Sequence, residues 1–104
     1  MKIYFVNSFF PELKDAKKVA KIVLEKKLAA CVNINEKIKS FFWWNNRISE
    51  ENEVELSFKT SLFKVKKLIN FLEKNHPYEC PCIIAFHVDE MNQKYRRWVL
   101  ENTK

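Results

Sequence analysis

Apolar positions along the chain change their spacing several times, and these changes predict the order of its elements. Residues 2–8 (KIYFVNS) hold four successive apolar residues, Ile3 to Val6, which is typical of a strand buried on both faces. Pro11 then opens a helical pattern with i, i+3, i+4, i+7 spacing. Its apolar stripe consists of Ala16, Val19, Ala20 and Val23, widened by Leu24 and Leu28, with Lys14, Lys17, Lys18 and Lys21 off the stripe.

From Ala30 the spacing changes to two, which predicts a strand that continues through the aromatic run FFWW at 41–44. Asn45 and Asn46 then predict a tight turn, because Asn tolerates the left-handed region of backbone space and the chain has no glycine. The returning strand, RISEENEVELSFKT, points Val54, Leu56 and Phe58 to one side and Glu53, Glu55, Ser57 and Lys59 to the other.

The second half of the chain predicts a helix, a strand and a short terminal helix. Thr60 or Ser61 can cap the helix that follows them. This helix must end near Asn75, because Pro77 disfavours helix at His76. Its apolar stripe consists of Leu62, Val65, Leu68, Ile69 and Leu72. Residues 82–88 (CIIAFHV) predict the strand, and MNQKYRRWVLEN predicts the terminal helix.

This order, β-α-β-β-α-β with a terminal helix, predicts an α+β, ferredoxin-like fold in one domain spanning 1–104. The sheet is antiparallel, with a long hairpin between its second and third strands. Right-handed crossovers place the first and third strands in the centre and the second and fourth at the edges.

Such a sheet has helices on one face only, yet its first and fourth strands are apolar on both faces. The FFWW run adds two large aromatic side chains on each side of an edge strand. An exposed apolar patch and an open edge both favour association, so we expect an oligomer rather than a monomer. The alternative is that the terminal helix folds back and covers the bare face through Tyr95 and Trp98.

Composition narrows the functional classes. The chain has 104 residues, a net charge of +6, three cysteines and no glycine, which excludes the Gly-rich phosphate-binding loops. The odd cysteine count predicts reduced thiols and a cytoplasmic location, and we expect neither a signal peptide nor a membrane span. The positive charge is compatible with nucleic-acid binding, but the lysines fall on the polar sides of the predicted helices, which favours solvated faces.

The stretch NHPYECPC at 75–82 carries the candidate chemistry. Imidazole and thiolate bind copper and zinc, so His76, Cys80 and Cys82 are candidate ligands, although no second half-site of a zinc motif follows. Cys31 is either a further ligand or a small buried residue. A cysteine–histidine catalytic pair would need an orienting group and oxyanion donors that no motif supplies. Structurally, Pro77 stops the helix and Pro81 begins an edge strand.

Two other residues of this stretch complete the candidate site. Tyr78 is expected to pack its ring and to form a hydrogen bond through its hydroxyl. Glu79 is expected to orient a ligand or to accept a hydrogen bond from a neighbouring subunit.

The chain resembles the CutA family of divalent-ion tolerance proteins almost from end to end. The resemblance is carried by LAACVNI at 28–34, SFFWW at 40–44, KT at 59–60, HPYE-x-P at 76–81 and YRRW at 95–98, so that Trp44 and Trp98 are among its marks. It implies a ferredoxin-like homotrimer whose hairpins pair across subunits, and a non-enzymatic protein that binds copper or other divalent ions and is linked to metal tolerance. His76, Cys31 and Cys82 are the predicted metal ligands.

The chain departs from the family pattern at three positions. Asn46 stands where members usually have Gly, Cys82 where many have Glu, and Asn7 where some have a ligating Cys. Two alternatives remain open. One is a small-ligand-sensing trimer resembling the nitrogen-regulatory P-two proteins. The other is an RNA-binding module, against which the acidic strand EVELSFKT argues, because that strand should carry a basic, glycine-containing signature.

Overall fold

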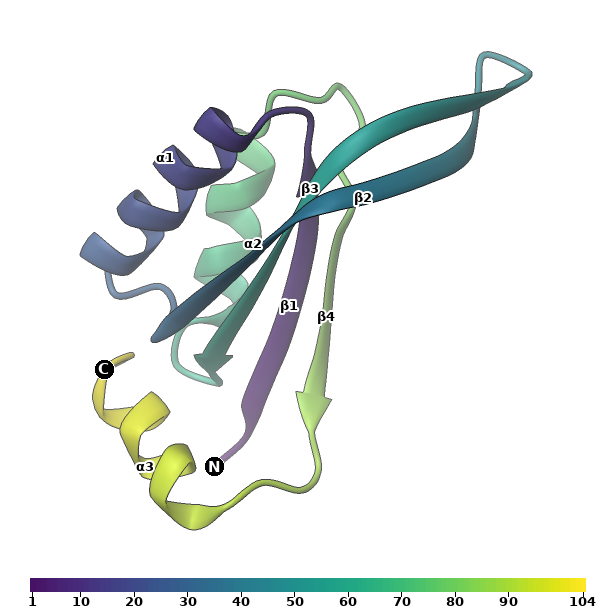
Figure 1. The fold of residues 1–104 in the computed structure, drawn as a ribbon. Coiled ribbons are helices and arrows are strands. Elements are labelled where there is room, and N and C mark those ends of the chain that lie inside the picture. Colours follow the sequence, from purple (N-terminus) through teal and green to yellow (C-terminus); the bar gives the residue numbers. More distant parts are fainter.

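Four antiparallel strands form a single sheet in the order β2-β3-β1-β4, in a computed structural model that describes all 104 residues (Figure 1). The strands are β1 (Ile3–Phe10), β2 (Cys31–Trp44), β3 (Arg47–Ser61) and β4 (Ile83–Val88), and the helices are α1 (Leu13–Glu25), α2 (Val65–Lys74) and α3 (Gln93–Glu101). The ferredoxin-like prediction is confirmed, including its central strands β1 and β3 and its edge strands β2 and β4. None of the three helices is long and apolar enough to cross a membrane.

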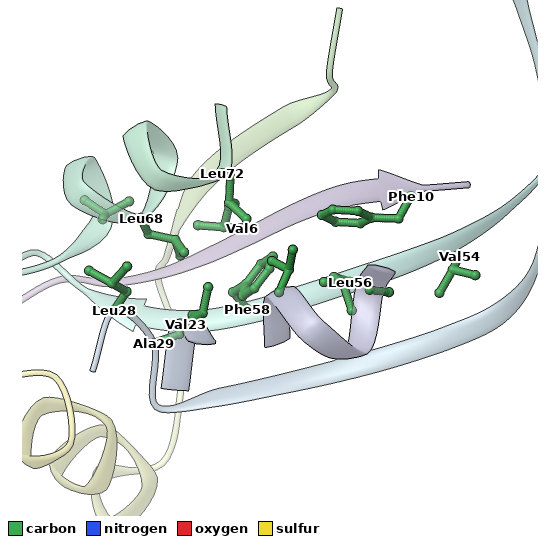
Figure 2. Packing of buried hydrophobic residues seen from close by; sticks show 13 residues of the cluster. Val6, Phe10, Val23, Leu28, Ala29, Val54, Leu56, Phe58, Leu68 and Leu72 are labelled. Atoms are coloured by element: carbon green, nitrogen blue, oxygen red, sulfur yellow. The ribbon is translucent and has the colours of Figure 1, made fainter. Parts of the chain in front are cut away.

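The hydrophobic core lies between the sheet and the two helices α1 and α2, which cover the same face (Figures 1 and 2). Alternate residues of β1 and β3 point into it, including Val6, Phe10, Leu56 and Phe58. They meet the predicted stripes of the helices, of which Val23, Leu68 and Leu72 are almost fully buried. Burial of a side chain of this size contributes about 1.5–3 kcal/mol, so each of these residues stabilises the packing of the helices on this face.

Several predicted details at element ends are wrong. Helix α2 begins at Val65, because β3 continues through Ser61 and the Ser61 hydroxyl accepts a hydrogen bond from the Phe63 N–H (3.3 Å), which forms a separate turn. Leu62 therefore precedes the helix and is exposed, and Leu24 also lies outside the core. Pro81 lies two residues before the first residue of β4 rather than opening it.

The hairpin of β2 and β3 extends well beyond the rest of the sheet (Figure 1). A two-residue turn joins its strands, with φ of 51° at Asn45 and 61° at Asn46, which confirms the predicted use of Asn in the left-handed region. The FFWW aromatic side chains lie on this extension and are all exposed, Trp43 to 72%. A β-bulge between Asn35 and Ile38 shifts the register where the extension begins.

The face opposite α1 and α2 is covered at one end only. Ile3 and Ser61 lie on that face by strand alternation, and both are fully buried because α3 packs there against β1 and β3. The hydroxyls of Ser61 and Thr103 are hydrogen-bonded at 2.7 Å. Farther along the same face Phe86 stacks on Phe5, with ring centroids 5.2 Å apart, and remains exposed. The terminal helix thus covers part of the bare face and leaves an apolar area open.

Candidate functional site

A cleft of about 810 Å³ lies between the extended hairpin and the 78–82 segment that precedes β4. Aromatic side chains of the FFWW run form one side, and the 78–82 segment contributes Tyr78, Glu79, Cys80 and Cys82. Three further carboxylates line it, from Glu12, Glu51 and Glu53, and no lysine or arginine does. The cleft is therefore acidic on an otherwise basic chain, and it contains most of the residues singled out from the stretch NHPYECPC.

His76 joins this segment to the end of β1. Its Nδ1 accepts a hydrogen bond from the Tyr78 N–H (3.1 Å), so its Nε2 carries the proton and donates to the Phe9 carbonyl (2.8 Å). The ring also stacks on Phe10, with centroids 4.3 Å apart. Burial lowers the pKa of His76, against smaller opposing effects of the Phe9 carbonyl and the Glu53 charge. With both ring nitrogens hydrogen-bonded, a neutral His76 positions the segment and has no free lone pair for a metal in this conformation.

Tyr78 forms the hydrogen bond that was expected of its hydroxyl, and its partner is Glu53 of β3 (2.7 Å). Glu53 is a buried residue, 8% exposed, at the wall of the cleft. Burial, and next the hydrogen bond to Glu53, raise the pKa of Tyr78. Sequence reasoning missed Glu53, because strand alternation places it with the solvent-facing residues; only the fold brings Tyr78 against it.

Cys80 and Cys82 are both exposed, with free thiols, on the wall of the cleft. The carbonyl of Cys82 accepts a hydrogen bond from the buried Ser8 hydroxyl (2.6 Å), which ties this end of the segment to the middle of the sheet. Glu79 also lines the cleft and is exposed. Its predicted role as an intersubunit acceptor stays a prediction.

The three predicted metal ligands do not meet within one chain. Cys31 is the first residue of β2, and it pairs with Lys59, which in turn pairs with Phe5. His76 contacts Phe9, four residues and about 13 Å farther along β1. No group of three or more His, Cys, Asp or Glu side chains is placed to hold a metal ion. The assignment of His76, Cys31 and Cys82 as ligands therefore stays a prediction, and a shared site would need more than one copy of the chain.

The environments of Cys31 and Asn7 differ from that of the cleft. The Cys31 thiol is half-buried, 3.7 Å from the Asn33 side-chain oxygen. Burial, and next a hydrogen bond with Cys31, raise the pKa of Tyr95 on α3. Asn7 lies on β1 and donates to the Glu55 carboxylate (3.3 Å). Neither residue reaches the cleft.

Comparison with known proteins decides the family. A family model described as CutA1 divalent ion tolerance protein matches residues 4–102. The chain belongs to the CutA1 family. The chain is 37% identical over 99 residues to the "Divalent-cation tolerance protein CutA" of Pyrococcus horikoshii, an alignment that covers 95% of this chain and 96% of that one. It is 40% identical over 94 residues to human "Protein CutA", covering 90% of this chain and 52% of the human one.

Solved CutA structures share the whole fold. CutA from Xylella fastidiosa superimposes with a TM-score of 0.96 at 28% identity and full coverage of both chains. CutA1 from Ehrlichia chaffeensis gives a TM-score of 0.94 at 33% identity, covering 100% of this chain and 98% of that one. The family resemblance and the fold class are thus confirmed.

Two aromatic residues that mark the family occupy different places. Trp44 lies at the end of β2 and lines the cleft, where it is partly exposed. Trp98 lies on α3 and stacks on Tyr95, with ring centroids 5.4 Å apart, away from the cleft. Trp44 is therefore part of the candidate site and Trp98 is part of the helix that covers the other end of the sheet.

Proposed function

We propose that this CutA1-family protein is a homotrimer that binds divalent metal ions, copper foremost, and contributes to metal tolerance without acting as an enzyme. The relatives' names support the link to divalent cations. The observation that carries the proposal is the acidic cleft: four carboxylates and two thiols converge there without a lysine or arginine to neutralise them. Such a cleft lowers the free energy of a bound cation.

The site is proposed to be completed between subunits. A tight divalent site needs three or four converging donors, and one chain brings no three His, Cys, Asp or Glu side chains together. The cleft wall includes the exposed aromatic residues of the hairpin, which a neighbouring copy would cover. Ligands such as Glu79 and Cys82 would then meet donors of the next subunit.

Association itself is supported by the apolar surface that one copy leaves open. Several large apolar side chains that are more than half exposed lie on the hairpin extension and on the bare face of β4, namely Phe41, Trp43, Ile48, Ile84 and Phe86. The edge strands β2 and β4 also have unpaired backbone groups, which favour hydrogen bonding to a strand of another copy. The number of three copies rests on the family resemblance, and sedimentation equilibrium measures it directly.

The non-enzymatic role and the cytoplasmic location are proposed from the hydrogen bonds of His76 and from the free cysteines. His76, the only histidine that lies beside the cleft's thiol-bearing segment, is hydrogen-bonded through both nitrogens, which supports a positioning rather than a catalytic role. The three unpaired thiols support a reducing compartment, the cytoplasm.

Metal titration of the purified protein tests the proposal. In calorimetry with Cu²⁺ and Zn²⁺ after chelator treatment, we expect saturable binding by the assembled protein. We expect loss of that binding in Trp44→Asp, which disrupts assembly by burying an unpaired charge. Equal affinity in assembled and dissociated protein would show that the site is not intersubunit, and no saturable binding would overturn the function.

A second candidate function is binding of a small organic ligand, favoured by the size of the cleft, which falls within the range of small-molecule sites. Its aromatic side and acidic lining fit a cationic ring compound. Thermal-shift measurements with a panel of such compounds in chelator test this candidate. A stabilised melting transition supports it, and an unchanged one rejects it.

A further inference from the structure

The positive charge of the chain is concentrated on one of its faces. Residues 12–27 and 64–74, which contain α1 and α2, carry ten lysines and four acidic residues. Their net charge of +6 equals that of the whole chain, so the nine basic and nine acidic residues elsewhere cancel. The buried stripes of both helices face the sheet, and nine of the ten lysines are exposed, with Lys64 half-buried. Because α1 and α2 cover the same face, these lysines form one surface, the lysine layer (Figure 1).

Little within the chain neutralises the lysine layer. Lys14 is the only one of its ten lysines that forms an ion pair, with the Glu12 carboxylate at 3.6 Å. Both side chains of this pair are largely exposed, so water and salt screen their attraction. The two other ion pairs of the chain lie outside the layer. Solubility alone would be served as well by lysines spread over the whole surface, whereas a field of one sign favours binding of an anionic partner.

One end of the lysine layer also exposes apolar side chains. Leu24 lies on the last turn of α1, and Leu62 and Phe63 lie in the turn that precedes α2; all three are exposed. The two helices run antiparallel, so the end of α1 and the start of α2 lie at the same end of the layer (Figure 1). A hydrogen bond from the Thr60 hydroxyl to the Leu28 carbonyl (2.7 Å) joins the two segments there.

This combination fits an anionic bilayer surface better than other polyanions. Lysines are attracted to such a surface as point charges, and neighbouring leucine and phenylalanine side chains can enter its headgroup region. Arginine is the residue that recognises single carboxylates and phosphates through two parallel hydrogen bonds, and the lysine layer contains no arginine. A nucleic-acid duplex is read by an element that enters a groove, whereas two helices side by side present a broad surface (Figure 1).

We propose that the lysine layer binds the surface of membranes that contain anionic phospholipids, with Leu62 and Phe63 entering the headgroup region. The layer lies on the sheet face opposite the bare face, so it stays accessible when copies associate through the bare face. This inference goes beyond the proposed function, and it requires neither a metal ion nor the acidic cleft.

Co-sedimentation of the full chain with lipid vesicles tests the proposal. The vesicles consist of phosphatidylcholine with or without phosphatidylglycerol, and all samples contain chelator, so that metal binding plays no part. We expect binding only to the vesicles with phosphatidylglycerol. Salt should release the protein, because the Debye length falls from about 10 Å at 0.1 M to about 3 Å at 1 M ionic strength.

Two triple variants with the same loss of charge separate the lysine layer from the net charge of the chain. One neutralises three exposed lysines of α1, and the control neutralises three exposed lysines outside the layer. They are Lys17→Gln/Lys18→Gln/Lys21→Gln and Lys37→Gln/Lys39→Gln/Lys94→Gln. Each lysine near an anionic bilayer raises the partition coefficient by about fivefold, so the first variant should bind about 100-fold more weakly. The control should stay within about fivefold of wild type, the effect of one lysine.

Two substitutions of Phe63 test the apolar contact. Phe63→Ser should lower the partition coefficient by about tenfold, because full burial of a phenylalanine contributes about 10–100-fold and Phe63 is partly exposed in the free chain. Phe63→Leu keeps an apolar side chain and should bind nearly as wild type. Sedimentation and melting without lipid should match wild type for every variant, because the substituted side chains are exposed.

Five results would each overturn the proposal. They are absence of binding to phosphatidylglycerol vesicles at low salt, equal losses in the two triple variants, and equal binding of Phe63→Ser and Phe63→Leu. The fourth is release from vesicles by inorganic phosphate at matched ionic strength, which would indicate a site for a single phosphate. The fifth is tighter binding to a DNA duplex than to the vesicles, which would assign the lysine layer to nucleic acid.

Discussion

Removal of the Tyr78 hydroxyl tests whether its bond to Glu53 holds the 78–82 segment in place. Tyr78→Phe keeps the ring, whose centroid lies 5.1 Å from that of His76, and deletes only the donor. Glu53, a residue that is 8% exposed, then loses the one side-chain hydrogen bond of its carboxylate. We expect a large effect for a single atom.

The magnitude follows from the burial of the two groups. Hydrogen bonds to charged groups contribute about 1.5–3 kcal/mol, and because Tyr78 is itself only partly buried we expect the lower part of this range, about 1.5–2 kcal/mol. For a domain of this size, each kcal/mol lowers the melting temperature by about 4–8 °C, so Tyr78→Phe should melt roughly 6–16 °C lower.

The assay is thermal and urea unfolding at fixed protein concentration in chelator, so that neither metal nor assembly changes between samples. Tyr4→Phe is the matched control, since Tyr4 is half-buried on β1 and its hydroxyl makes no side-chain hydrogen bond; we expect it to stay within about 0.5 kcal/mol of wild type. In a double-mutant cycle, Glu53→Met should cancel part of the loss in Tyr78→Phe, because two apolar partners leave no orphaned carboxylate. Equal losses in Tyr78→Phe and Tyr4→Phe, with zero coupling to Glu53, would refute the reasoning.

Three further predictions concern pH, assembly and the hairpin turn. The folded pKa of His76 lies below its ordinary 6.5, so its contribution to the free energy of unfolding is complete above pH 6.5 and is lost as the pH falls through 6.5 toward the folded value. Urea midpoints in chelator should therefore fall more steeply with acid in wild type than in His76→Gln. Parallel slopes of the two proteins would contradict this. Trp44→Asp should dissociate the assembly in sedimentation. Leu24→Asp is the matched control, because Leu24 is 42% exposed and Trp44 is 43% exposed, and it should leave the assembly intact. An intact Trp44→Asp assembly would show that the hairpin is not the interface. Because φ is positive at Asn46, Asn46→Val should destabilise the fold by about 1–2 kcal/mol and Asn46→Gly should not. Chemical unfolding measures the difference, and equal stability of the two variants would contradict the turn argument.

The sequence by itself was sufficient for the fold because its local signals agree with one another. The spacing of apolar residues separates strands from helices, and the order of elements leaves few topologies for the sheet. Asn45 and Asn46 predicted the tight turn of the hairpin without glycine. Element ends were less certain, as Leu62 shows, because the bond between Ser61 and Phe63 forms a turn that apolar spacing does not reveal.

The candidate site was only partly visible in the sequence. His76, Tyr78 and Cys82 stand out because they are chemically distinctive and close together in the sequence. In the structure Tyr78 and Cys82 line one cleft, and His76 accepts a hydrogen bond from the Tyr78 N–H. Glu53 did not stand out, since alternation along β3 groups it with solvent-facing residues. The fold places it under Tyr78, some 25 residues away in the chain.

Only the tertiary structure decided which groups meet. In the folded chain Cys31 and His76 lie apart along the sheet, and both nitrogens of His76 are hydrogen-bonded to backbone groups. Carboxylates from three segments lie in the same cleft as two thiols. Spacing along the chain determines local conformation, because that depends on neighbouring residues. The distance between residues far apart in sequence depends on strand register and loop paths, which are fixed only when the whole sheet is packed.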